Sequence, residues 1–155
     1  MNFNLRRFLI CIAIPLGVGL LSALLTRGSM EAFGNLNQPP LSPPAWLFPV
    51  VWTILYILMG ISLYLITGLD KSVERDRSIF LFALQLFFNF MWSIFFFNLQ
   101  FYFFSFVWLV ALWALILLMI MSMKKVSPLA AYLNIPYAIW VTFAGYLNLA
   151  ISILN

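Results

Sequence analysis

Five long apolar stretches follow one another along the chain, separated by shorter polar segments. They cover about 8–26, 44–67, 79–97, 102–123 and 129–154. A helix needs about 20 apolar residues to cross a hydrocarbon core roughly 30 Å thick, and each stretch is near that length. The pattern therefore predicts an all-α integral membrane protein, built as a five transmembrane helix bundle in a single domain over residues 1–155.

Residues that flank these stretches predict where the helices begin and end. Ser42-Pro43-Pro44 and Ser127-Pro128 each place an N-cap serine directly before a proline, which suits the first helical turn. Ser78 is in position to cap the third helix, and Gly68 is in position to end the second. These signals agree with the lengths of the apolar stretches.

Prolines within the stretches predict local distortion, and one connection is unusually long. Pro15, Pro49 and Pro136 each remove a backbone hydrogen bond if they lie inside a helix. The long loop 27–43 contains one segment, Met30–Leu36, that can form a short helix. A loop of this length is often a lid or binding element, and otherwise it is flexible.

The composition agrees with a membrane location and limits the chemistry. Hydrophobic residues make up 65% of the chain and charged residues 8%, against about 25% charged in soluble domains. The chain has no histidine, so the usual metal ligand and general base are missing. The single cysteine, Cys11, excludes an intrachain disulfide and is interpreted as a small buried apolar residue.

Basic residues are distributed unequally between the two ends of the predicted bundle. Seven of the eight lie at one end, namely Arg6, Arg7, Lys71, Arg75, Arg77, Lys124 and Lys125, and only Arg27 lies at the other. The positive-inside rule then predicts a cytoplasmic N-terminus and an outer C-terminus, in what we expect to be a bacterial cell membrane. No basic stripe is present, so no nucleic acid partner is expected. The alternative that the first stretch is a signal peptide requires a shorter apolar run.

Three of the predicted helices carry polar and aromatic stripes at helical spacing. Within each stripe, the residues recur at intervals of three and four positions, so they share one face of the helix. The second predicted helix carries Trp52 and Tyr56, the third carries Gln85, Asn89, Trp92 and Phe96, and the fifth carries Trp140, Phe143, Ala144, Leu147 and Asn148. Facing inward together, they would enclose a flat, largely apolar cavity suited to a planar aromatic or sterol-like ligand.

Two interpretations of these stripes stay open from the residues alone. Amides in a span often form interhelical hydrogen bonds, and we favour that role for Gln85. For Asn89 a ligand contact is equally consistent. Aromatic residues at this spacing are usually packing, although the indole N–H groups of Trp52 and Trp140 need partners. The four acidic residues lie in loops, so no catalytic pair, proton relay or metal cluster is indicated.

Three longer segments contain these stripes and carry motifs that are specific in combination. They are PPLSPPAWLFPVVWTILYILMG at 39–60, QLFFNFMW at 85–92 and VSPLAAYLNIPYAIWVTFAGYLN at 126–148. Together they resemble the translocator protein family, also called the tryptophan-rich sensory proteins. The resemblance covers nearly the whole chain beyond the first apolar stretch. It departs from many relatives at Ala32-Phe33, where they have Trp-Tyr, and at Tyr146, which no basic residue follows.

The resemblance implies a five-helix bundle, often a homodimer, with an interhelical pocket under the first long loop. Relatives bind porphyrins such as protoporphyrin IX, and benzodiazepine-site ligands, in this pocket. Some bacterial relatives are reported to degrade porphyrin in light, through the pocket tryptophans. By motif, the ligand-binding residues here would be Trp52, Tyr56, Asn89, Trp92, Trp140, Phe143, Ala144 and Leu147.

Three hypotheses about function follow. The first is a membrane receptor that binds porphyrins and similar hydrophobic ligands, needs no cofactor, and uses Asn89 as a hydrogen-bond donor. The second is a light-dependent porphyrin-degrading enzyme with Trp52 and Trp140 as candidate catalytic residues. The third is a transporter of hydrophobic small molecules. Ala13, Gly17, Gly19 and Ala23 supply small-residue spacings that serve either a homodimer or packing within the bundle.

Overall fold

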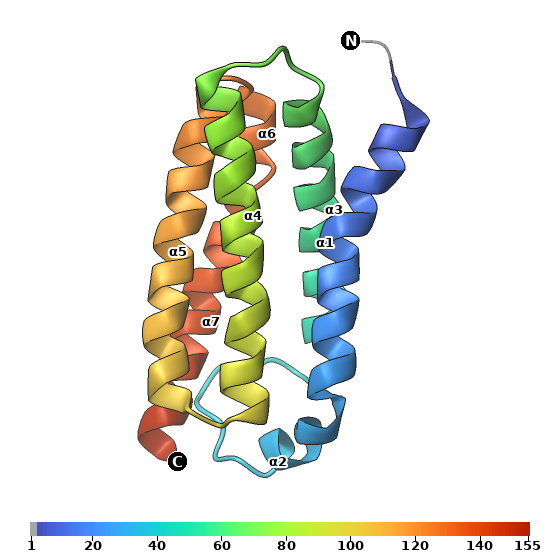
Figure 1. The fold of residues 1–155 in the computed structure, drawn as a ribbon. Helices are drawn as coiled ribbons and strands as arrows, with labels where there is room; N and C mark the ends of the chain where they lie inside the picture. The colour runs from blue at the N-terminus through green and yellow to red at the C-terminus, as the bar shows by residue number, and fades with distance from the viewer. Residues whose placement is uncertain (1–2) are drawn as a thin grey trace.

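A computed structural model describes residues 3–155, which contain helices and no strand. Five helical segments within that range are long and apolar enough to cross a membrane (Figure 1). Their main helices are α1 (Leu5–Thr26), α3 (Leu47–Thr67), α4 (Val73–Ser93), α5 (Tyr102–Lys124) and α7 (Ile135–Leu154). The predicted five-helix membrane bundle is confirmed.

Four short elements connect or extend the long helices. They are η1 (Arg27–Ser29), α2 (Met30–Gly34), η2 (Ile94–Asn98) and α6 (Pro128–Tyr132). The helix α2 confirms the short helix expected in the long loop. The element η2 is a π-helical turn that continues α4, and only three residues separate it from α5. The connection between the third and fourth spans is therefore tight.

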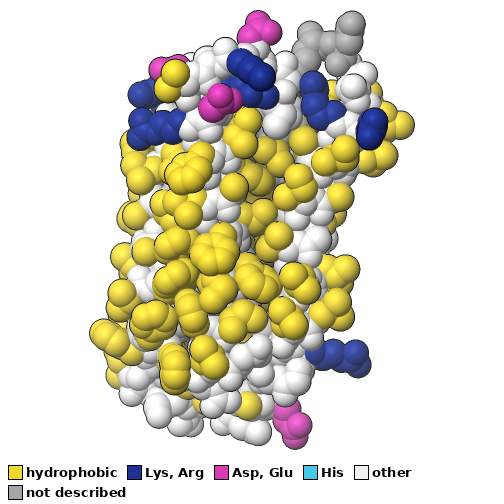
Figure 2. Space-filling model, viewed as in Figure 1, with side chains coloured by type: hydrophobic (Ala, Val, Ile, Leu, Met, Phe, Trp, Pro, Cys, Tyr) yellow, Lys and Arg dark blue, Asp and Glu magenta, His cyan; other side chains and the backbone are white. Residues whose placement is uncertain are grey.

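The long helices form a closed bundle in which α1 packs along α3, and α5 packs against both α4 and α7. The start of α1, the α3–α4 loop and α6 lie at one end (Figure 1), and α2, the α4–α5 turn and the C-terminus lie at the other. Lysine and arginine side chains gather at the first end, and a broad hydrophobic zone separates it from the second (Figure 2). The predicted charge asymmetry is thus present in three dimensions.

The contact between α1 and α3 is unusually close at Gly60. A Cβ atom at this position would lie 2.7 Å from the Cα of Ile12 and 2.9 Å from the carbonyl oxygen of Cys11. Both atoms belong to the backbone of α1, so a side chain on Gly60 requires the helices to separate. Small residues at such contacts let helix backbones approach in a membrane, where packing replaces the hydrophobic driving force.

The second span begins later than predicted, and Ser42 does not cap it. The helix α3 starts at Leu47, whereas Ser42 donates its hydroxyl hydrogen to the carbonyl of Pro39 at 2.8 Å. Residues that precede proline avoid helical backbone angles, and consecutive prolines extend this effect to Pro43. Pro49 therefore falls in the first turn of α3, where its missing N–H costs no intrahelical bond. The predicted distortion at Pro49 is wrong for this reason.

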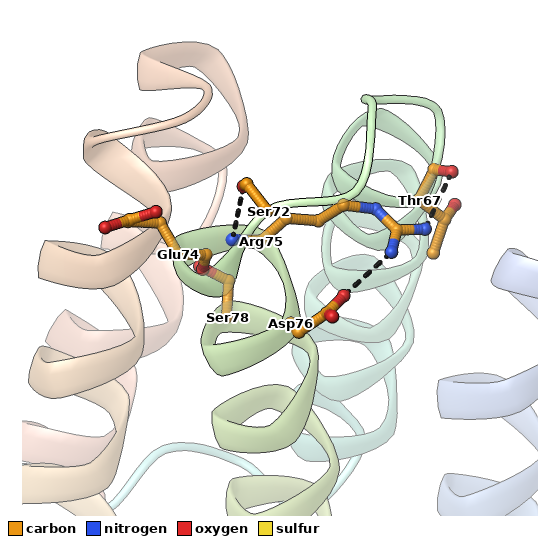
Figure 3. A network of polar contacts seen from close by, with 6 residues as sticks. All are labelled: Thr67, Ser72, Glu74, Arg75, Asp76 and Ser78. Carbon is orange, nitrogen blue, oxygen red and sulfur yellow. Dashed lines mark hydrogen bonds and ion pairs between the residues drawn. The ribbon is translucent and has the colours of Figure 1, made fainter.

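The third span begins earlier than predicted. Ser72, not Ser78, caps α4 by accepting a hydrogen bond from the backbone N–H of Arg75 at 3.2 Å (Figure 3). Ser78 is buried inside the helix, where its hydroxyl contacts the carbonyl oxygen of Glu74 and the hydroxyl of Ser122. The charged first turn continues the helix beyond the apolar stretch, with Glu74 near its positive end.

The fifth span is interrupted near its start. Ser127 caps α6 as predicted, by accepting from the N–H of Ala130. The chain then breaks before α7 begins at Ile135, because Pro136 has no N–H to donate to the preceding turn. The buried Asn134 stabilises the break by donating to the carbonyl of Ala130 at 2.9 Å. The distortion predicted at Pro136 is confirmed, as is the helix end at Gly68.

Candidate ligand cavity

A cavity of about 550 Å³ lies in the half of the bundle that carries the long loop. Its walls come from α1, α3, α4 and α7, and loop residues Met30, Phe33 and Gln38 cover its end. None of the lining residues is charged. Seven of the eight predicted ligand-binding residues line it, namely Trp52, Tyr56, Asn89, Trp92, Trp140, Ala144 and Leu147.

The α3 wall presents two aromatic rings that lie one helical turn apart. The ring centroids of Trp52 and Tyr56 are 5.6 Å apart at an interplanar angle of 29°, so the two side chains stack. The Trp52 indole also lies 6.3 Å from that of Trp92 on α4. Trp52 is only half-buried, because one part of its surface faces the cavity. These rings form a flat aromatic wall.

Asn89 lies at the centre of a buried hydrogen-bond network that joins three helices. Its Oδ1 accepts from the hydroxyl of Tyr56 at 2.9 Å, and its Nδ2 donates to the hydroxyl of Tyr137 at 2.8 Å. Tyr137 in turn donates to Oε1 of Gln85 at 2.8 Å. The interhelical role expected for Gln85 is confirmed, and Asn89 has the same role while also lining the cavity. One hydrogen of the Asn89 amide is not used by this network.

Trp92 is held in place through its indole nitrogen. Its Nε1–H donates to Oδ1 of Asn148 on α7 at 2.9 Å. Asn148 also donates to the carbonyl of Tyr102 at 2.7 Å and accepts from the hydroxyl of Ser105 at 3.2 Å. The Asn148 amide therefore links α4, α5 and α7 at the cavity wall, and Trp92 presents its ring to the cavity from a fixed position.

Trp140 differs from Trp92 in having an unpaired donor. Its Nε1 is buried and has no hydrogen-bond partner within residues 3–155. The ring packs edge-on against Phe48 at 5.9 Å between centroids, which places it beside the start of α3. Ala144 and Leu147 continue the same face of α7 along the cavity. An unpaired buried N–H costs about 1–3 kcal/mol, so a ligand acceptor at this position would relieve it.

Phe143 is the predicted ligand-binding residue that does not line the cavity. Its ring contacts Trp140 at 5.6 Å and Tyr146 at 6.2 Å between centroids, on the flank of α7. Successive helical residues are rotated by about 100°, so Phe143 and Ala144 point in clearly different directions. Phe143 thus supports Trp140 rather than facing the cavity.

The long loop is tied to the bundle at three points. Ser29 donates to Oδ1 of Asn98 at 2.8 Å, and the backbone N–H of Asn37 donates to Oδ1 of Asn155 at 2.9 Å. Tyr146 donates its hydroxyl hydrogen to the carbonyl of Pro40 at 2.8 Å. Phe33, one of the two residues that depart from the Trp-Tyr pair of relatives, packs on Phe96 and Phe97. The loop is therefore a cover over the cavity, fixed by hydrogen bonds.

One wall of the cavity was not predicted from the sequence. The helix α1 contributes Leu16, Gly19, Leu20, Ser22, Ala23 and Thr26. Gly19 is half-buried and packs within the bundle, Ala23 is exposed but lines the cavity, and Ala13 and Gly17 are exposed away from it. The small residues Gly19 and Ala23 were the only sign in the sequence that α1 approaches the cavity. A Cβ atom on Gly19 would clash with the ring of Tyr56. Tyr137 was likewise missed as the link between Asn89 and Gln85.

The chain matches a known protein family over most of its length. The profile of the TspO/MBR family matches residues 11–154. The tryptophan-rich protein TspO of Chlorobaculum tepidum is 39% identical over 157 aligned residues, which cover 100% of this chain and 99% of that protein. The protein of the same name from Archaeoglobus fulgidus is 34% identical and covers 98% of this chain and 99% of its own length.

A relative from a mammal is similar over most of the chain as well. The translocator protein of Bos taurus is 35% identical over 135 residues, which cover 84% of this chain and 79% of that protein. The region that the family profile matches contains α3, α4 and α7, whose stripes form the cavity wall. The similarity therefore extends to the elements that build the cavity.

Proposed function

Because this chain belongs to the TspO/MBR family, we propose that it is a membrane receptor whose cavity binds a flat, largely apolar tetrapyrrole of the porphyrin class. Five membrane-spanning helices and this family make it an integral multi-pass membrane protein. The names of its relatives, tryptophan-rich sensory protein and translocator protein, agree with a sensing or receptor role. The proposal adds the class of ligand that such a receptor would bind.

One observation carries the proposal: three indoles from three different helices line a single cavity. Trp52, Trp92 and Trp140 come from α3, α4 and α7. Aromatic rings prefer offset stacked or edge-to-face contacts, and each such pair adds about 0.5–1.5 kcal/mol beyond area burial. A macrocycle presents a large flat π surface, so it can contact several of these rings at once. An aliphatic ligand would not use this arrangement.

The size and polarity of the cavity agree with this ligand class. Its volume of about 550 Å³ lies within the roughly 300–1,000 Å³ range of small-molecule sites. Since no lining residue is charged, carboxylates on a ligand would have to remain at the loop, where water can solvate them. The apolar ring would then lie deeper, between α3 and α7.

Two polar groups can orient the ligand within the apolar walls. The unpaired Nε1–H of Trp140 is one donor, and the uncommitted amide hydrogen of Asn89 is the other. A few fixed donors in a mostly apolar site determine orientation and specificity. We therefore keep Asn89 as a ligand contact and add Trp140 as a second hydrogen-bond donor.

The test is quenching of tryptophan fluorescence by protoporphyrin IX in detergent, with Trp140→Phe and Asn89→Ala as variants. We expect each to weaken binding about tenfold, the value of one well-placed hydrogen bond. Trp113→Phe is the control, because Trp113 donates to Thr142 outside the cavity. If both cavity variants bind as tightly as the control, the site assignment is wrong. Displacement by a benzodiazepine-site ligand would test whether that class shares the cavity.

A second candidate function is light-dependent oxidation of the bound porphyrin by oxygen. The indoles of Trp52 and Trp140 favour it, since both line the cavity and an excited macrocycle exchanges electrons with a nearby indole without an acid–base pair. Illuminated turnover with product detection tests this function. Loss of porphyrin absorbance at the rate of free porphyrin would refute it. Transport of hydrophobic molecules and homodimer formation stay predictions, testable by liposome flux and by mass measurement.

A further inference from the structure

A second cavity, of about 630 Å³, lies on the other side of α1 from the ligand cavity. We call it the α1–α4 groove, because α1 and α4 form its sides and α3 its floor. Its lining includes Arg7, Ile10, Ile14, Thr67, Ala83 and Phe87. No residue lines both cavities, so the groove is a separate feature of the fold.

The groove opens toward the bilayer and is at least as deep as one leaflet. Ile10, Ile14 and Phe87 on its sides are exposed at the protein surface. Along α1 the lining runs from Arg7 to Leu21, a rise of about 21 Å at 1.5 Å per residue, and along α4 it runs from Ile79 to Phe90, about 16 Å. Half of a hydrocarbon core roughly 30 Å thick is about 15 Å. An acyl chain lying along the groove would therefore end near the middle of the membrane.

The only charged residue in the groove is Arg7, which lies at its mouth. The guanidinium carbon of Arg7 is 4.6 Å from the centroid of the Tyr64 ring, so a cation–π contact holds the side chain there. Its Nε and Nη2 are buried and have no hydrogen-bond partner among residues 3–155. No carboxylate in that range lies within 4.0 Å of it. The cation at the mouth thus has unsatisfied donors and no counter-ion from the protein.

The neighbouring Arg75 differs from Arg7 in having a counter-ion, although its own buried Nε also has no hydrogen-bond partner among residues 3–155. Its Nη1 forms an ion pair with Asp76 at 2.9 Å, and its Nη2 donates to the carbonyl of Thr67 at 3.4 Å (Figure 3). Thr67 also lines the groove, so Arg75 is close to the same region. Arg75 has an anionic partner, and Arg7 lacks one among residues 3–155.

We propose that the α1–α4 groove binds an anionic phospholipid of the bilayer, with an acyl chain between α1 and α4 and the phosphate on Arg7. A phosphate supplies acceptors for the unpaired guanidinium donors, and planar guanidinium groups bind phosphate by paired hydrogen bonds. The groove lies at the end that holds seven of the eight basic residues. Anionic headgroups concentrate at the cytoplasmic surface, to which the positive-inside rule assigns this end.

Native mass spectrometry of the full-length chain in detergent tests the proposal. Phosphatidylglycerol and phosphatidylcholine with identical acyl chains are titrated separately, and the bound fractions give apparent affinities. We expect phosphatidylglycerol to bind about tenfold more tightly than phosphatidylcholine, and Arg7→Gln to remove that preference. Arg6→Gln is the matched control, because Arg6 is exposed, adjacent and outside the groove, and its loss changes the net charge equally.

A second variant tests the apolar part of the groove independently. Ala83→Trp places a large side chain between α1 and α4, and we expect it to abolish binding of both lipids. Equal affinity for the two lipids in the parent chain overturns the proposal, as does an equal loss in Arg7→Gln and Arg6→Gln. If neither lipid binds and Ala83→Trp instead reduces a dimer peak, the groove is an interface between two copies and the proposal is wrong.

Discussion

The contact between α1 and α3 gives the sharpest test of how this bundle is held together. In Gly60→Ala, the new methyl group would lie 2.7 Å from the Cα of Ile12 and 2.9 Å from the carbonyl oxygen of Cys11. Neither backbone atom can rotate away as a side chain can. The two helices must therefore move apart, and the packing along their length is lost in part.

The expected magnitude comes from two opposing effects. Alanine inside a helix is favoured over glycine by about 0.5–1 kcal/mol. Overpacking a tight contact costs about 1–3 kcal/mol. Gly145→Ala is the matched control, since its methyl group would meet only the side chain of Leu109 at 3.6 Å, an ordinary contact. Gly60→Ala should then be less stable than Gly145→Ala by about 1–3 kcal/mol, since the helix preference cancels between them.

Equilibrium unfolding in mixed detergent micelles, followed by tryptophan fluorescence, measures this difference. A gap of about 1.4 kcal/mol corresponds to a tenfold change in the unfolding equilibrium, well above the error of such titrations. If Gly60→Ala proves as stable as Gly145→Ala, the close approach of α1 to α3 does not contribute to stability, and the reasoning fails. The same conclusion would follow if Gly60→Ala and Gly145→Ala were both less stable than the parent chain by the same amount.

Two further predictions concern the polar contacts around the ligand cavity. Tyr137→Phe removes the hydroxyl that joins two buried amides, so it should destabilise the bundle by about 1–3 kcal/mol in the same unfolding assay. Tyr132→Phe, at an exposed position, should leave stability unchanged. Tyr146→Phe removes the bond from α7 to the long loop, so backbone amide exchange at 37–42 should accelerate several-fold while exchange in α4 stays constant. Unchanged loop exchange would show that this bond does not hold the cover in place.

The helices and the cavity face of three of them could be predicted from the sequence for a clear physical reason. Amide side chains are energetically costly in an apolar span, and aromatic side chains stand out from its aliphatic residues. Where both recur at three- and four-residue spacing, they identify one face of the helix. Trp52, Asn89 and Trp140 lie around one cavity because each of their helices turns that face inward. The prediction that Phe143 lines the cavity was wrong because the residues three and four positions after Trp140 point in directions about 100° apart.

The contribution of α1 could not be predicted in the same way. A soluble protein separates inside from outside by polarity, whereas a membrane helix is apolar toward lipid and toward protein alike. Leu16 lines the cavity and is half-buried, while Leu24 is exposed, and nothing in their residue type distinguishes them. The same limit applies to helix ends. Ser72 and Ser78 are both acceptable caps, and only the tertiary contact of Ser78 with Ser122 decides between them.

The opposite walls of the ligand cavity are held by different forces. The walls from α3, α4 and α7 are joined by buried hydrogen bonds through Asn89 and Tyr137, whose lengths fix how the helices are spaced. The wall from α1 has no hydrogen bond to these groups. It is positioned by close packing at Gly60, and by Gly19, whose missing side chain makes room for the ring of Tyr56. Gly60 and Gly19 therefore set the distance between the α1 wall and the α3 wall of the cavity. The aromatic side chains on the other walls determine which ligand would fit the space that remains.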